Sequence, residues 1–195
     1  MLKEIIKKNR TFRRFYQDYK IPDKTLIELI DLARLSSSPR NQQALKFIPI
    51  NSEELNSEVF KLLSWAGALT DWKGAEEGER PSAYIIILED RNLIPPKSKS
   101  FNDMACGIVA QSITLGAVEK NIGGCMVAAI QKNKLKKLLN LSEQFEILLV
   151  IALGKPKEEI ILEKMPKNGD FNYWRDDNNI HHVPKRELDE IITKI

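Results

Sequence analysis

Cationic side chains near the N-terminus are the residues of this chain best suited to chemistry. Residues 9–15 read Asn-Arg-Thr-Phe-Arg-Arg-Phe, with three arginines beside a hydroxyl group and two aromatic rings. A guanidinium group is permanently charged and presents planar, forked donors that match phosphate oxygens. A short basic run is commonly a solvated surface, but Phe12 and Phe15 favour burial, which would hold the arginines against a core. A second cationic pair, Lys185–Arg186, lies near the C-terminus. We therefore expect the two ends of the chain to meet at one phosphate group.

Polar amides form a second candidate group, in the loop Ser38-Pro39-Arg40-Asn41-Gln42-Gln43. Asn41 and Gln43 can both donate and accept hydrogen bonds toward a ligand, although capping of the loop itself is an alternative role. No side chain stands out as a general acid or base. His181 and His182 are the only histidines, which argues against a zinc site. We interpret both as structural, with proton donation as the alternative.

The elements that must position these residues follow from hydrophobic periodicity. It predicts helices over residues 2–8, 22–35, 53–68, 102–120, 131–140 and 187–194, and strands over 47–50, 83–88 and 147–153. Residues 125–130 are expected to form a turn that leads into a short extended segment. Pro49 suggests an edge strand, whereas residues 83–88 are apolar on both faces and predict a central strand. Residues 157–184 are polar and are expected to be irregular. The pattern indicates an α+β fold with a mixed central β-sheet flanked by helices.

The helix expected over residues 102–120 has no charged residue between Met104 and Val118. A helix that is apolar on all sides lies in a large core or at a subunit interface. Its several small residues would let another helix approach closely.

Composition limits the class of protein. The chain has 195 residues, 43% hydrophobic and 29% charged, as expected for one globular domain spanning residues 1–195. A net charge of +3 is too small to indicate nucleic-acid binding. We expect neither a signal peptide nor a membrane span, and place the protein in the cytoplasm. Cys106 and Cys125 are then expected to be buried thiols, with a disulfide as the open alternative.

Five segments together resemble the nitroreductase family. Residues 9–15 resemble its opening Arg-Arg-Ser-x-Arg-x-Phe, with Asn9 in place of the first arginine. Residues 38–44 resemble Ser-x-x-Asn-x-Gln-Pro, with alanine in place of proline. Residues 123–126 resemble the turn Gly-Leu-Gly-x-Cys-Trp, with methionine in place of tryptophan. Residues 151–156 resemble the strand end Ala-Leu-Gly-x-Pro, and residues 182–186 the closing Pro-Lys-Arg. The five occur in the family's order across nearly the whole chain.

The resemblance implies a nitroreductase-like fold and an intertwined homodimer with FMN sites built from both subunits. It implies hydride transfer from NADH or NADPH to flavin N5, and then to a nitro, quinone or related small acceptor in a ping-pong cycle. Two alternatives stay open: a flavin-fragmenting or other specialised branch of the family, and a flavin-binding protein without turnover. Residues 64–80 and 167–180 are the expected specificity loops.

The resemblance also implies roles for individual residues. The phosphate would be held by Arg10, Thr11, Lys185 and Arg186. Arg13 would reach the pyrimidine end of the flavin and stabilise the reduced ring; the alternative is an ion pair with an acidic side chain. The loop would contribute Ser38, Arg40, Asn41 and Gln43 to the ring, its imide edge or the ribityl chain. Backbone N–H groups of Val127, Ala128 and Ala129 would face N5 and O4, with plain strand packing as their alternative. No side chain is expected to be catalytic, since the cofactor carries the chemistry.

Overall fold

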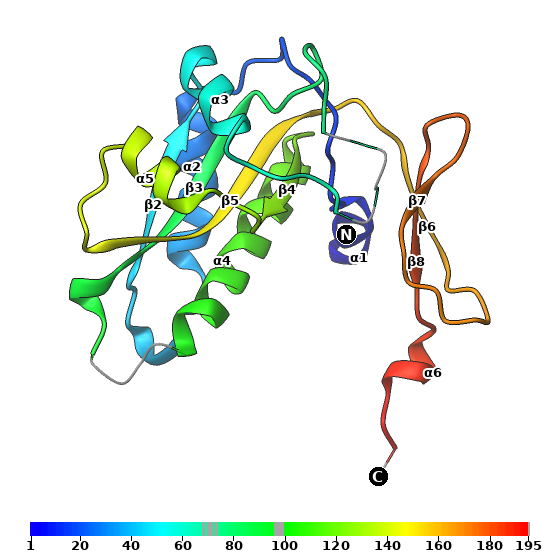
Figure 1. The fold of residues 1–195 in the computed structure, drawn as a ribbon. Coiled ribbons are helices and arrows are strands. Elements are labelled where there is room, and N and C mark those ends of the chain that lie inside the picture. Colours follow the sequence, from blue (N-terminus) through cyan, green and yellow to red (C-terminus); the bar gives the residue numbers. More distant parts are fainter. Residues whose placement is uncertain (68, 70–71, 73, 96–99, 195) are drawn as a thin grey trace.

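A five-stranded sheet forms the centre of the protein (Figure 1). The computed structural model describes residues 1–67, 69, 72, 74–95 and 100–194. The strand order is β1-β5-β3-β2, and β4 also pairs with β5. These strands are β1 (Phe15–Tyr16), β2 (Leu45–Ile50), β3 (Ala83–Asp90), β4 (Gly123–Val127) and β5 (Phe145–Pro156).

The predicted α+β class is confirmed, and the central and edge strands lie where the sequence places them. All eight residues of β3 are buried between β2 and β5. β2 carries Pro49 and pairs only with β3 among the described strands, as an edge strand would. The five strands pair antiparallel, so the sheet is less mixed than predicted. A parallel bridge between Thr11 and Gly124 adjoins it.

Helices cover both faces of this sheet, and side chains of β3 alternate between two cores. On one face, Ile85 and Ile87 pack with α2 and α4. On the other face, Tyr84 and Ile86 pack with α3 and α5. The period-two alternation of a strand accounts for this division. The helices are α1 (Leu2–Lys8), α2 (Asp23–Leu35), α3 (Glu53–Phe60), α4 (Ser100–Glu119), α5 (Lys132–Leu138) and α6 (Leu188–Ile191), with 3₁₀ turns η1 (Pro39–Asn41) and η2 (Arg91–Leu93).

Helix α3 ends at Phe60, whereas the sequence pattern predicts a helix to residue 68. Beyond the helix, the chain turns and pairs with the segment after β4. The Ser64 N–H donates to the Ala129 carbonyl at 2.9 Å, and the Gln131 N–H donates to the Leu62 carbonyl at 2.9 Å. This pairing gives the Ser64 N–H and the Leu62 carbonyl the hydrogen bonds that further helical turns would otherwise provide, so the helix need not continue. Residue 68 itself lies outside the described residues.

The segment after β5 is ordered as a second sheet, so the prediction of an irregular tail is wrong. Strand β6 (Ile160–Lys164) pairs parallel with β8 (His181–Lys185), and β7 (Trp174–Arg175) pairs antiparallel with β8. Figure 1 shows this sheet and α6 extending away from the central sheet. In the part of the chain that the structure describes, no helix combines the length and apolar character needed to traverse a bilayer.

Candidate functional site

The N-terminal motif lies along the end of the central sheet. Strand β1 pairs with β5, placing Phe15 opposite Pro156. The Phe12 N–H donates to the Gly124 carbonyl at 3.1 Å. A Cβ atom on Gly154 would lie 2.7 Å from the Phe15 ring, so only glycine admits this close approach. The fold therefore brings together three of the five motif segments, at residues 9–15, 123–126 and 151–156.

Arg10 borders a cation-rich cavity of about 500 Å³. The cavity is also lined by Lys7, Lys8, Lys155 and Glu158, so its lining contains four cationic residues and one acidic residue. One Arg10 guanidinium nitrogen, Nη2, donates to the carbonyl of the α1 residue Ile6 at 2.5 Å. Its Nε is buried without a hydrogen-bond partner in the described structure, and burial lowers the pKa of Arg10. The cationic residues in the lining of this cavity suit an anion.

Arg13 is 8% exposed and its guanidinium contacts the tail of the same chain. Its Nη1 lies 3.3 Å from His181 Nε2 and donates to the Thr11 carbonyl at 3.3 Å. The guanidinium carbon lies 4.6 Å from the centre of the Tyr173 ring, a cation–π contact. Among the described residues, no carboxylate forms an ion pair with this guanidinium. The buried His181 is held neutral, because desolvation and then the charge of Arg13 lower its pKa to about 4.

A buried carboxylate, Glu158, lies beside this segment and was not singled out from the sequence. Its side chain is fully buried and pairs with Arg14 Nε at 3.5 Å and with Arg175 Nη2 at 2.9 Å. It also accepts hydrogen bonds from the backbone N–H groups of Arg13 and Arg14. Arg175 in turn lies 4.6 Å from the Trp72 ring. This contact joins the two expected specificity loops, although residues 68, 70–71 and 73 lie outside the described residues.

The polar loop at the end of α2 lies elsewhere in the chain, beside α4. The Ser38 hydroxyl accepts a hydrogen bond from the Gln43 N–H at 3.0 Å. The Gln43 side chain donates to Asn41 Oδ1 at 3.1 Å, so these groups cap the loop in the isolated chain. Arg40, Asn41 and Gln43 all have positive φ, and the Arg40 guanidinium lies 5.2 Å from the Phe101 ring. Ser38 and Gln43 border a second cavity, of about 280 Å³, against α4.

The remaining predicted residues contact neither cavity. Val127 is buried at the end of β4, whereas Ala128 and Ala129 are exposed just beyond it. Lys185 and Arg186 are exposed at the end of β8, where the Arg186 guanidinium lies 3.8 Å from a carboxylate oxygen of Glu190. One chain by itself therefore brings Arg10, Thr11 and Arg13 together, but leaves the loop at residues 38–43 and the Lys185–Arg186 pair apart from them.

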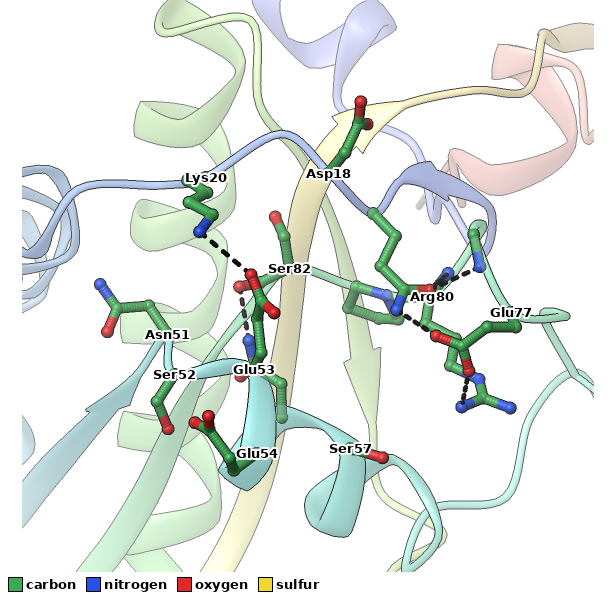
Figure 2. A pocket seen from close by; sticks show the side chains of 14 residues that line it. Asp18, Lys20, Asn51, Ser52, Glu53, Glu54, Ser57, Glu77, Arg80 and Ser82 are labelled. Carbon is green, nitrogen blue, oxygen red and sulfur yellow. Dashed lines mark hydrogen bonds and ion pairs between the residues drawn. The ribbon is translucent and has the colours of Figure 1, made fainter.

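A third cavity, of about 780 Å³, contains none of the predicted residues. It lies between residues 17–20, the start of α3 and residues 77–82 (Figure 2). Lys20 Nζ is 3.0 Å from Glu53 Oε1, and Arg80 is paired with Glu77, so both cations of the lining are already neutralised. With further carboxylates in its lining, this cavity disfavours a phosphate group.

Comparison with known proteins identifies the family. The family pattern described as the nitroreductase family matches residues 6–155. A relative from Archaeoglobus fulgidus, named provisionally as an NADH dehydrogenase/NAD(P)H nitroreductase, is 26% identical over 153 residues, covering 75% of this chain and 80% of the relative. A nitroreductase family protein from Streptococcus pneumoniae TIGR4 is similar in structure over 100% of both chains, with a TM-score of 0.71 and 19% identity. The NADPH:FMN oxidoreductase from Vibrio harveyi, solved in complex with NAD⁺, is similar over 86% of this chain and 74% of its own, with a TM-score of 0.66 and 19% identity. Because the family match spans most of the chain, including the arginine motif and the glycine turn, the protein belongs to the nitroreductase family.

Proposed function

We propose that the protein is an FMN-dependent oxidoreductase that uses NADH or NADPH to reduce a nitro, quinone or related small acceptor. Membership of the nitroreductase family makes it an oxidoreductase. The names of the Vibrio harveyi and Archaeoglobus fulgidus relatives, with their FMN and NAD(P)H, support this cofactor and reductant. When bound, FMN supplies the centre that accepts a hydride from NAD(P)H and passes it to the acceptor in a ping-pong cycle.

The observation that carries this proposal is the cation-rich cavity at Arg10. A dianionic phosphate needs fixed donors and positive charge, and Arg10 offers both, with Lys7, Lys8 and Lys155 in the same lining. Thr11 lies next to it, at the bridge to Gly124. Its hydroxyl would add a neutral hydrogen bond to the phosphate. The residues present therefore fit the phosphate end of FMN.

A second subunit would complete the site. Lys185 and Arg186, together with the loop residues Ser38, Arg40, Asn41 and Gln43, lie apart from Arg10 within one chain, as expected of a site that two chains share. Helix α4 supports such an interface, because Met104 is 59% exposed on a helix with no charge between Met104 and Val118. We therefore propose an intertwined homodimer, in which Lys185 and Arg186 pair with the phosphate and Asn41 and Gln43 bind the flavin imide edge.

Two further roles belong to this proposal. Arg13 would stabilise negative charge at the pyrimidine end of the flavin, and its packing against Tyr173 and His181 would keep the guanidinium in a fixed position. The exposed residues Ala128 and Ala129, just after β4, would be available to a flat ring. The two cysteines are buried free thiols, which suits the reducing cytoplasm, where we place the protein.

The test begins with the purified protein and an absorbance spectrum with and without added FMN. We expect a flavin band at about 450 nm that NADH or NADPH bleaches without oxygen and that a nitro compound or quinone restores. A protein that binds FMN but is not bleached would be a binder without turnover. A protein that stays colourless with excess FMN would contradict the proposal.

Arg10→Met tests the cavity directly, since methionine keeps the apolar part of the side chain and removes the charge. Loss of a charge-assisted hydrogen bond of about 1.5–3 kcal/mol should weaken FMN binding by about tenfold to a hundredfold. Arg91→Met is the matched control, because Arg91 pairs with Glu146 on the surface and lines none of the three cavities. Equal FMN affinity for the two variants in a fluorescence titration would remove Arg10 from the site.

A further inference from the structure

Glu158 follows β5 by two residues, at the point where the chain leaves the central sheet. Its neighbours fix the backbone on both sides. The Lys157 N–H donates to the Arg14 carbonyl at 3.0 Å, and the His181 N–H donates to the Glu159 carbonyl at 2.9 Å. Residues 157–159 therefore connect the arginine motif to strand β8.

The Glu158 carboxylate makes contacts with both of these parts. Its Oε1 accepts from the backbone N–H groups of Arg13 and Arg14, and its Oε2 pairs with the side chains of Arg14 and Arg175. A fully buried carboxylate with this many donors is strongly held, since removing the carboxylate would leave its buried donors without an acceptor. The backbone that carries Arg13 cannot shift unless these hydrogen bonds break.

The position of Glu158 relative to the Arg10 cavity is informative. Glu158 is the acidic residue in a lining that otherwise carries Lys7, Lys8, Arg10 and Lys155. A carboxylate beside an anion site weakens anion binding by charge alone, since like charges repel. A role in holding the neighbouring cationic residues in position would account for an acidic residue beside an anion site.

We propose that Glu158 is a positioning residue, which holds the Arg13–Arg14 backbone so that the cofactor-binding arginines are presented to FMN. This inference rests on the proposed function, because it concerns the same site. A structural role in the tail alone would leave the flavin unaffected. A positioning role requires changes in FMN affinity and in the midpoint potential of the bound flavin.

Glu158→Gln separates the two effects of this side chain, because they have opposite signs. Loss of the negative charge alone would tighten FMN binding. Loss of the hold on the backbone would weaken FMN binding, because glutamine has a single oxygen and cannot accept both from the backbone N–H groups of Arg13 and Arg14 and from the side chains of Arg14 and Arg175. We expect the dissociation constant for FMN to rise by about tenfold, and the midpoint potential of bound flavin to fall as Arg13 moves.

Glu163→Gln is the matched control. Glu163 lies in the same tail sheet, where it accepts from the Trp174 indole at 3.0 Å and pairs with His182 Nδ1 at 3.1 Å. Its loss should loosen the tail without affecting the Arg13–Arg14 backbone. We expect its FMN affinity and flavin potential to match those of the unmodified protein.

Wild-type protein, both variants and Glu158→Asp are titrated with FMN after circular dichroism confirms folding. If the wild type binds no FMN, the proposed function fails, and the inference fails with it. If the wild type binds and Glu158→Gln binds equally or more tightly, only the positioning role fails. If Glu158→Gln does not fold, Glu158→Asp decides. It keeps the charge but shortens the reach, so weaker FMN binding supports the role and unchanged binding overturns it.

Discussion

The buried His181 should make the stability of the protein depend on pH in a defined window. The imidazole is 1% exposed and faces the charged groups Arg13, Arg14 and Arg175, and also His182. Its pKa is about 4 in the folded protein against 6.5 in an unfolded chain. Between pH 6.5 and about pH 4, His181 binds a proton in the unfolded chain but stays neutral in the folded protein. The free energy of unfolding therefore falls as the pH drops from 6.5 to about 4, and the loss is complete below that pKa.

The size of this effect follows from the two pKa values. Between about pH 7.5 and about pH 5, His181 alone should remove about 2 kcal/mol of unfolding free energy. His181→Gln is the informative variant, because a glutamine oxygen can still accept from Arg13 but does not titrate. The assay is urea unfolding at fixed protein and FMN concentrations across this range, followed by tryptophan fluorescence. The unfolding free energy of the wild type relative to the variant should drop by about 2 kcal/mol toward the acid end. Parallel profiles for the two proteins would refute the assignment of a buried, neutral His181.

Two further predictions concern packing. Gly154→Ala would place a Cβ atom 2.7 Å from the buried Phe15 ring, so we expect a loss of about 1–3 kcal/mol in urea unfolding. Gly67→Ala, where no atom lies within 4 Å of the new Cβ, is its control, and equal midpoints for the two would contradict the packing. Tyr84→Phe removes a buried hydroxyl that has no hydrogen-bond partner in the described structure, so stability should be unchanged or raised by up to about 1 kcal/mol. A clear loss of unfolding free energy in the same assay would show that the hydroxyl has a hydrogen-bond partner.

Much of the central sheet could be predicted from local sequence. The run of apolar residues in β3 required burial on both faces, and Pro49 required an edge. The tail could not be predicted in this way. Its strands β6 and β8 carry charged residues in a short parallel pair, so they lack the alternation by which a strand is recognised. The end of α3 was missed because its pairing partner, near Ala129, lies far along the chain.

The candidate site was predictable only where residue type alone indicates chemistry. The arginines at positions 10 and 13 were identifiable because guanidinium groups beside aromatic residues are distinctive. Arg13 and His181 are in contact although they lie 168 residues apart in the sequence, so no local sequence pattern predicts the contact. Glu158 resembled any surface glutamate in a polar segment. Its importance becomes visible only when the donors of Arg13, Arg14 and Arg175 converge on it.

Strand β5 has a consequence for how this protein tolerates change in length. It pairs with β3 along much of its length, and with β4 and then β1 toward its end, before the chain reaches Glu158. Insertion of a single residue late in this strand would shift everything after it by one position. Side chains that now lie on one face of the sheet would then lie on the other. The Glu158 carboxylate would move away from its donors in Arg13, Arg14 and Arg175. Variation in chain length should therefore be accommodated in the loops on either side of this strand, while the distance between its last pairings and Glu158 stays constant.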